Sequence, residues 1–280
     1  MKKCGIIDIG SNSIRMGLYE YDDYSFRLID SYVQVKELVS FVKDGKLTDK
    51  GISACVSTIV SFKDFAHTQG ITSLYAIATA FARKLDNPDS FIKEVEKYVK
   101  IEILTSEQEA KLSFKGSMAN VDMLEGVMID IGGGSTELVQ FTNNKITYET
   151  SYDTGCVALH DLNPVEPELY IEDILRKEKH HFSGDMLGTG GTVESLFIIY
   201  DKLNDKRIKL SKYEVAYILK HYDDENIKAI IEEFIYARKE TLRYGLTILS
   251  TIMNYYQIDE LYLSEYGLKE GYLIENIMNK

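Results

Sequence analysis

The fold is decided by Gly5-Ile6-Ile7-Asp8-Ile9-Gly10-Ser11-Asn12-Ser13, an apolar run that ends in Asp-Ile-Gly and small polar residues. The pattern returns as Gly126-Val127-Met128-Ile129-Asp130-Ile131-Gly132-Gly133-Gly134-Ser135-Thr136. An apolar run of this length predicts a buried strand. Glycines after a strand let the backbone turn tightly and present N–H groups to phosphate oxygens, and an aspartate there can hold a divalent cation. The sequence predicts two facing loops that grip one polyphosphate.

The segments that follow the two copies also match. After each loop come an apolar segment, a polar turn and a second such segment: Ile14–Tyr21, Asp22-Asp23 and Phe26–Asp30 in the first copy, Glu137–Phe141, Asn143-Asn144 and Ile146–Thr150 in the second. Each copy therefore predicts strand, phosphate loop, strand, hairpin turn and strand. Two unrelated glycine-rich turns are the alternative, but the shared order favours a repeat.

Composition indicates a globular protein of two domains. The chain has 280 residues, of which 45% are hydrophobic and 27% charged. No apolar run approaches the roughly 20 residues of a membrane span, and the N-terminus enters a strand directly, so we expect neither membrane insertion nor a signal peptide. Cys4, Cys55 and Cys156 are widely spaced, which favours reduced thiols and a cytoplasmic location.

The net charge of −12 argues against nucleic-acid binding, which needs a basic face. A polyanionic substrate would then need local positive charge or a bound metal. The densest basic stretch is Lys202, Lys206, Arg207, Lys209 and Lys212. It could help to hold a polyanion, or it could be a solvated loop between helices.

Elsewhere the chain alternates strands and helices, which predicts α/β layers. We expect helices at 48–68, 166–180, 211–222, 225–238 and 242–256, one capped by Asn87 and one from Leu268, and strands at 73–78, 101–104, 185–187 and 260–264. A capping box, Ser211 with Glu214, begins the third of these helices. The segment Gly188-Thr189-Gly190-Gly191-Thr192 lies between a strand and a helix and predicts a third phosphate loop.

Three charged residues could carry chemistry beside the loops. Glu109 could activate a water, although Ser106 and Glu109 also have capping-box spacing, which on spacing alone is preferred. Arg83 could bind phosphate or pair with Asp86 or another nearby acid. Glu137 could join Asp8 and Asp130 in a metal site, or be a polar residue on a half-exposed strand.

These segments resemble the exopolyphosphatase and guanosine pentaphosphate phosphohydrolase (Ppx/GppA) family of the actin–hexokinase–Hsp70 superfamily. The resemblance covers nearly the whole chain in order. It rests on Asp8–Ser13, Ala78–Asn87 with Arg83, Ser106–Ala110, Asp130–Glu137, Gly155-Cys156-Val157, Gly188–Thr192 and Ser264–Gly271.

The resemblance implies two ribonuclease-H-like (actin-like ATPase) α/β domains with a cleft between them. We expect the domains at 1–120 and 121–265, with the last helix, 266–280, on the first. It also implies release of terminal phosphate from polyphosphate or guanosine pentaphosphate with Mg²⁺ or Mn²⁺, and Glu109 as the catalytic glutamate. The expected metal ligands are Asp8, Asp130 and Glu137; the expected phosphate-binding residues are Gly10, Ser11, Asn12, Ser13, Arg83, Gly132, Gly133, Gly134, Ser135, Gly188, Thr189, Gly190 and Gly191.

Departures from the family pattern keep other functions open. Gln108 replaces a glutamate beside the expected base, which could change metal binding or rate. Longer family members continue into a C-terminal region, so we expect short polyphosphates or a nucleotide rather than processive action on long polyphosphate. A non-catalytic guanosine tetra- or pentaphosphate sensor and an ATP-dependent small-molecule kinase of the same superfamily are the alternatives. A homodimer is possible, and no nucleic-acid or membrane partner is expected.

Overall fold

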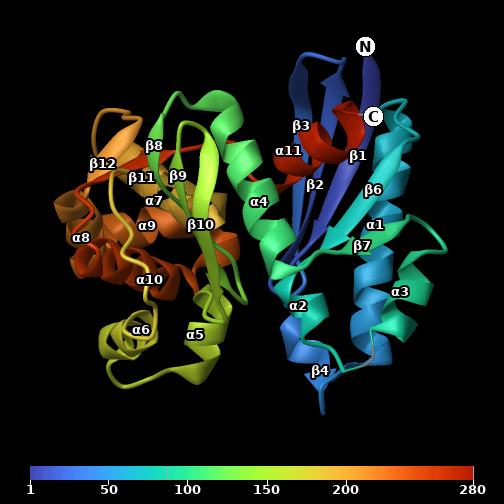
Figure 1. Ribbon diagram of the computed structural model, residues 1–280. Helices are drawn as coiled ribbons and strands as arrows, with labels where there is room; N and C mark the ends of the chain where they lie inside the picture. The colour runs from blue at the N-terminus through green and yellow to red at the C-terminus, as the bar shows by residue number, and fades with distance from the viewer. Residues whose placement is uncertain (87, 280) are drawn as a thin grey trace. The chain divides into compact units, whose positions relative to one another are not determined.

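The chain forms two compact units in the computed structural model, which describes residues 1–86 and 88–279 (Figure 1). Unit 1 is Met1–Glu109 with Tyr272–Lys280, and unit 2 is Ala110–Gly271. The expected cap Asn87 lies outside the described residues. The expected domain limits, 1–120 and 121–265, stay predictions.

Unit 1 is built on a five-stranded sheet in the order β3-β2-β1-β6-β7. β1 pairs with β2 and β2 with β3 in antiparallel fashion, whereas β1–β6 and β6–β7 are parallel. The predicted hairpin and strands are therefore confirmed. The strands are β1 (Lys2–Ile9), β2 (Ser13–Tyr21), β3 (Phe26–Val35), β6 (Leu74–Ala78) and β7 (Ile101–Ile103).

Helix α1 (Asp49–Thr68) covers this sheet because its apolar residues recur at helical spacing. Ile52, Ile59 and Phe62 are buried against the strands, and the Thr48 side chain accepts a hydrogen bond from the Gly51 N–H at the start of the helix. The shorter elements are 3-10 helix η1 (Leu38–Phe41), β4 (Val42–Lys43), β5 (Lys46–Leu47), α2 (Ala80–Arg83) and α3 (Asp89–Val95).

Unit 2 repeats the topology in the order β10-β9-β8-β11-β13-β12. Its first five strands pair with the same parallel and antiparallel pattern as those of unit 1. β12 is an extra antiparallel edge strand, so the basic stretch is partly strand rather than loop. The strands are β8 (Glu125–Ile131), β9 (Thr136–Thr142), β10 (Lys145–Tyr152), β11 (Met186–Thr189), β12 (Lys209–Ser211) and β13 (Glu260–Leu263).

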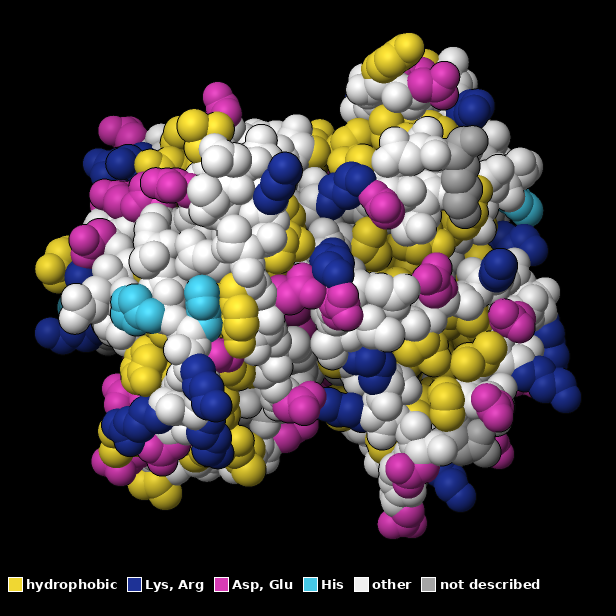
Figure 2. All heavy atoms as spheres, in the orientation of Figure 1, with side chains coloured by type: hydrophobic (Ala, Val, Ile, Leu, Met, Phe, Trp, Pro, Cys, Tyr) yellow, Lys and Arg dark blue, Asp and Glu magenta, His cyan; other side chains and the backbone are white. Residues whose placement is uncertain are grey.

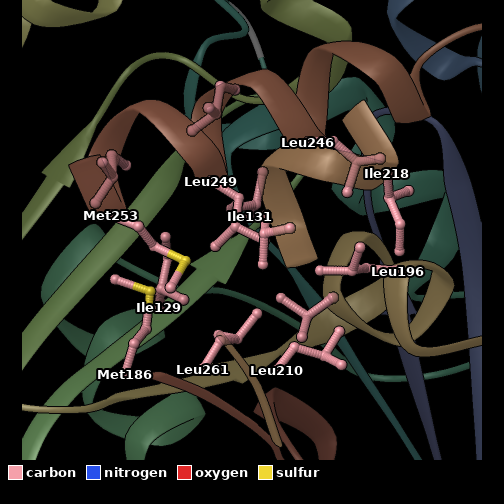
Figure 3. Packing of buried hydrophobic residues seen from close by; sticks show 14 of the residues in the cluster. Ile129, Ile131, Met186, Leu196, Leu210, Ile218, Leu246, Leu249, Met253 and Leu261 are labelled. Carbon is pink, nitrogen blue, oxygen red and sulfur yellow. The ribbon is translucent and has the colours of Figure 1, made fainter. Parts of the chain in front are cut away.

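Helix α10 (Leu242–Tyr255) is the central helix of the core of unit 2. Its Leu246, Leu249 and Met253 pack with Ile129 and Ile131 of β8 (Figure 3). The capping box of Ser211 and Glu214 is confirmed, whereas the helix expected at 166–180 ends at Leu175. The other helices are α5 (Cys156–Leu162), α6 (Pro167–Leu175), α7 (Gly190–Leu203), α8 (Lys212–Lys220) and α9 (Glu225–Phe234), with 3-10 turns η2 (Met118–Asn120) and η3 (Tyr236–Arg238).

Two helices continue from one unit into the other along the chain. α4 (Ser106–Ser117) begins in unit 1, and α11 (Leu268–Tyr272) leads back to it and continues as a π-helix, η4 (Leu273–Met278). The expected final helix from Leu268 therefore forms, and its last turns belong to unit 1.

Acidic and basic side chains are interspersed over the visible surface (Figure 2). In the basic stretch, Arg207, Lys209 and Lys212 form ion pairs with Glu214, Glu260 and Asp259 at 3.2, 3.6 and 2.6 Å. These partners reduce the positive charge that the stretch can offer to a polyanion.

The cysteines are free thiols, and all three are buried. Burial raises the pKa of the Cys4 and Cys55 thiols to about 12. Of the helices formed by residues 1–86 and 88–279, none combines the length and the apolar character of a membrane span.

Candidate active site

The first phosphate loop is closed by a hydrogen bond from the Gly10 N–H to the Ser13 carbonyl at 3.1 Å. The Asn12 carbonyl accepts from the N–H groups of Lys36 and Glu37 at 2.9 and 2.8 Å, and the Ser11 carbonyl accepts from Val39 at 3.3 Å. The segment after β3 thus engages the carbonyls of the loop. A loop whose carbonyls face the scaffold can turn its N–H groups toward an anion.

The second loop has the same construction. The Gly132 N–H donates to the Ser135 carbonyl at 3.0 Å, and the segment after β10 again engages the loop carbonyls. The N–H of Cys156 donates to Gly132, and that of Val157 to Gly133, at 2.9 and 3.0 Å. Gly155 permits this approach, because a Cβ there would lie 2.5 Å from the Gly132 carbonyl oxygen. The predicted repeat therefore extends to its supporting hydrogen bonds.

The residue opposite the aspartate distinguishes the two loops. Asp8 lies opposite Arg15 in the register of β1 and β2. Asp130 lies opposite Glu137 in the register of β8 and β9. Directly opposed side chains on neighbouring antiparallel strands have Cβ atoms about 5 Å apart, so the charges of each pair act on each other. The first loop combines a carboxylate with a cation, and the second combines two carboxylates.

Glu137 is buried, with only 1% of its surface exposed. Its Oε1 accepts hydrogen bonds from the hydroxyls of Ser135 and Ser151 at 2.7 and 2.9 Å. Hydroxyl donors stabilise a carboxylate in a buried setting, where an unsatisfied charge is costly. Glu137 is thus an oriented buried acid rather than a half-exposed strand residue.

Asp130 is fixed on both sides of its carboxylate. Oδ2 accepts from the Ser113 hydroxyl of α4 at 2.8 Å. Oδ1 lies close to Gly190, where an added Cβ would approach it to 2.6 Å. Gly190 also has φ +78°, a conformation that glycine adopts at little cost. The third glycine-rich segment therefore contacts the aspartate of the second loop.

Most of the third glycine-rich segment is buried. Gly188 pairs with Ile129 and Leu263 inside the sheet, and the Thr189 hydroxyl donates to the Tyr266 carbonyl at 2.7 Å. Gly191 is also buried, whereas Gly190 is partly exposed at the start of α7. Gly190 is thus the member of this segment that is best placed for a ligand.

In unit 1 the structure brings together Glu109 and Arg83. Glu109 Oε2 accepts from Arg83 Nη1 at 2.6 Å, and the same nitrogen donates to the Leu104 carbonyl at 2.9 Å. The two side chains are only 9% and 20% exposed. The acid that pairs with Arg83 is thus Glu109 rather than Asp86. A buried carboxylate held by a guanidinium has a fixed position, which a general base requires.

At the start of α4, Gln108 rather than Glu109 makes the capping hydrogen bonds. The helix begins at Ser106, so Thr105 is the capping residue. The Gln108 Oε1 accepts from the Thr105 N–H at 2.8 Å, and the Gln108 N–H donates to the Thr105 hydroxyl at 3.1 Å. The capping box predicted for Ser106 and Glu109 is therefore wrong by one residue. Gln108 replaces the usual glutamate in a role that either residue fills.

The donor set of the second loop fits magnesium. Within the described part of the chain, no three or more His, Cys, Asp or Glu residues gather as a metal site. Mg²⁺ needs no such group, because it binds oxygen ligands and commonly uses one or two carboxylates together with substrate phosphates. Asp130 and Glu137, which lie opposite each other on adjacent strands, are the two carboxylates that would hold such an ion. Asp8, the third expected ligand, belongs to unit 1 and lies opposite Arg15.

Residues 33–280 match the Ppx/GppA phosphatase family. The chain belongs to this family. A bifunctional 3-dehydroquinate synthase/phosphatase of Fusobacterium nucleatum is 24% identical over 98% of the chain and 46% of its own length. A putative exopolyphosphatase of Haemophilus influenzae is 22% identical over 97% of the chain and 90% of its own length. The chain thus spans less than half of the first relative.

Solved structures show that the fold is that of the family. The Aquifex aeolicus Ppx/GppA family member superposes with a TM-score of 0.80 at 22% identity, covering 99% of this chain and 98% of that one. An exopolyphosphatase from Cytophaga hutchinsonii gives 0.85 at 18% identity, with coverage of 99% and 98%. The predicted fold class, α/β of the ribonuclease-H-like (actin-like ATPase) type, is confirmed.

Two residues at these loops escaped the sequence analysis. Arg15 follows the first loop at the position that Glu137 takes after the second, so aligning the two copies would have found it. Ser113 gave no comparable signal. It contacts Asp130 from a helix 17 residues earlier in the chain, and such a contact depends on tertiary packing.

Proposed function

We propose that this chain is a divalent-cation-dependent phosphohydrolase that releases the terminal phosphate of inorganic polyphosphate or guanosine pentaphosphate. Glu109 carries the proposal, because it is a buried carboxylate held at 2.6 Å by Arg83 beside the start of a helix. Membership of a phosphatase family and relatives that include a putative exopolyphosphatase support the same class of reaction.

In the proposed reaction, Glu109 accepts a proton from the attacking water. The water oxygen bonds to the terminal phosphorus, and the bond from that phosphorus to the bridging oxygen breaks. Orthophosphate and a chain one phosphate shorter are released. Positioned base catalysis of this kind contributes roughly 10²–10⁴-fold to a rate.

Arg83 links the base to the substrate in this scheme. A guanidinium pairs with phosphate oxygens as readily as with a carboxylate. Arg83 is therefore assigned to hold Glu109 in position and to bind a phosphate oxygen of the substrate. Gly10 to Ser13 and Gly132 to Ser135 are assigned to the remaining phosphate oxygens through their backbone N–H groups and hydroxyls.

Asp130 and Glu137 are the residues assigned to hold a divalent cation. When bound, magnesium would neutralise negative charge on the phosphate oxygens. In a chain of net charge −12, this would also offset repulsion between the protein and its polyanionic substrate.

The test is phosphate release from tripolyphosphate, long-chain polyphosphate and guanosine pentaphosphate, each with and without Mg²⁺. We expect phosphate release from at least one of these substrates when Mg²⁺ is present and none when it is absent. Glu109→Gln should lower kcat by roughly 10²–10⁴-fold. Glu107→Gln is the matched control, since Glu107 is an exposed acid in the same helical turn.

Other outcomes would redirect the assignment. Full activity in Glu109→Gln would remove this residue from the reaction. Tight binding of guanosine pentaphosphate without turnover at any metal concentration would favour a sensor. Transfer of phosphate from ATP to an acceptor, with no release from polyphosphate, would favour a kinase.

A further inference from the structure

Asp130 owes its orientation to a buried contact from outside its own sheet. Ser113 is fully buried on α4, and its hydroxyl donates to Asp130 Oδ2 at 2.8 Å. The other carboxylate oxygen lies against Gly190, whose missing side chain leaves room for it. The hydroxyl of Ser113 and the open space at Gly190 therefore both contribute to how the carboxylate plane is turned.

The terminal torsion of an aspartate has a broad energy minimum, so the side chain by itself does not select one orientation of the carboxylate. A strand fixes where the Cβ atom points, but not how the carboxylate rotates about the bond beyond it. A buried helical serine commonly donates to a carbonyl of its own helix. Ser113 instead donates to the carboxylate of another element, so its hydroxyl is available to set that rotation.

We propose that Ser113 is a positioning residue for the divalent cation of this site, acting through Asp130. The inference rests on the proposed function, which assigns Asp130 as a ligand. The Ser113 hydroxyl uses Oδ2 as its acceptor and so presents Oδ1 on the side of Gly190 and the third glycine-rich segment. Loss of such a supporting hydrogen bond typically weakens metal affinity by about 10–100-fold.

Ser117 provides a matched control on the same helix. It is equally buried, but its hydroxyl donates to the Phe114 carbonyl at 2.9 Å, within α4. Ser113→Ala and Ser117→Ala thus remove the same atom from the same helix at the same depth. Only the first of them removes a contact to Asp130.

The experiment measures Mn²⁺ affinity by electron paramagnetic resonance on the intact chain without substrate. Ser113→Ala should weaken binding by about 10–100-fold, and Ser117→Ala by less than about threefold. Adding Mn²⁺ should raise the midpoint of thermal unfolding less in Ser113→Ala than in wild type, because ligand stabilisation scales with affinity. A purely structural role would lower the metal-free midpoint and leave the Mn²⁺ affinity unchanged.

Asp130→Asn separates this inference from the proposed function. If it abolishes Mn²⁺ binding while Ser113→Ala binds normally, the role of Ser113 is overturned and the metal assignment stands. If Asp130→Asn also binds normally, both are overturned. Should Ser113→Ala fail to fold, Ser113→Cys replaces it; its thiol is a weaker donor, so unchanged affinity there would count equally against the proposal.

Discussion

The two phosphate loops have the same pattern of backbone hydrogen bonds but differ in the charge beside their aspartates. Each is closed by the same glycine-to-serine hydrogen bond, at 3.1 Å in the first and 3.0 Å in the second, and each has its carbonyls engaged by the segment after its hairpin. Across from the aspartate, however, stands Arg15 in the first loop and Glu137 in the second.

This difference shows how a repeated scaffold can take on separate tasks. Glycine and serine spacing sets the backbone, whereas one position on the following strand sets the charge beside the aspartate. We infer that the first loop binds phosphate without a cation and that the second binds it together with one. Substitutions of Glu137 and Arg15 separate the two roles, and substitutions of Gly155, Gln108 and Glu37 probe the structure around the loops and Glu109.

Glu137→Gln and Arg15→Gln should affect different ligands. Glu137→Gln removes a proposed metal ligand, so Mn²⁺ affinity should fall by about 100-fold or more. Arg15→Gln should leave Mn²⁺ affinity unchanged and raise KM for tripolyphosphate roughly tenfold, as expected for one charge-assisted hydrogen bond. Equilibrium Mn²⁺ binding and initial rates measure the two effects. Equal losses of Mn²⁺ affinity in both variants would break the comparison.

Gly155→Ala should destabilise the second loop by pushing away the segment that donates hydrogen bonds to the loop carbonyls. The added Cβ would meet backbone atoms of Gly132 and Gly133 at 2.5 Å, which cannot be relieved by a side-chain movement. We expect a loss of roughly 2 kcal/mol in the free energy of unfolding, measured by urea denaturation.

A second glycine serves as the control for this steric effect. Gly70 has φ +72° and no atom within 4 Å of an added Cβ, so Gly70→Ala measures conformational strain without a clash. Gly155 has φ −116°, where alanine is unstrained. If Gly155→Ala matches wild type in stability, the tight support of the second loop does not exist in solution.

Gln108→Ala should weaken the helix that carries Glu109. Alanine removes one hydrogen bond of the capping box, at an expected cost of about 1 kcal/mol in unfolding free energy. Gln108→Glu should retain that stability, because glutamate fills the same position of the box. Thermal unfolding of the two variants measures the difference, and equal losses in both would argue against the Thr105 box.

Glu37→Gly is expected to have the smallest effect. Glu37 adopts φ +46° where the segment after β3 meets the first loop, a conformation that favours glycine. Relief of this strain should stabilise the chain by roughly 0.5–1 kcal/mol. A raised midpoint of thermal unfolding would confirm it; a lowered midpoint would show that the Glu37 side chain contributes more than the strain costs.

Local patterns explain what the sequence could predict. The two apolar runs, their glycines and the hairpins after them depend on neighbouring residues, and the structure places both loops at strand ends as expected. The capping box was misplaced by one residue, because Thr105 and Ser106 are both good capping residues and only the helix boundary selects between them.

Tertiary contacts explain what it could not. The ion pair of Arg83 with Glu109 joins residues 26 positions apart. Their sequence signals were separate: Arg83 follows a strand and a turn, and Glu109 lies at a helix start and matches the family's catalytic glutamate. The extra strand β12 forms because Leu210 is buried beside Leu261, a pairing that no short-range periodicity signals.

The central claim is that Asp130 and Glu137 beside the second Asp-Ile-Gly loop hold a divalent cation that binds phosphate there, whereas the first loop binds phosphate without one. A crystal structure of Glu109→Gln with Mn²⁺ and tripolyphosphate tests it most directly. We predict an anomalous Mn²⁺ peak at the carboxylates of Asp130 and Glu137, and phosphate density at Gly10–Ser13 and Gly132–Ser135. A Mn²⁺ peak away from Asp130, or phosphate at neither loop, would contradict the account.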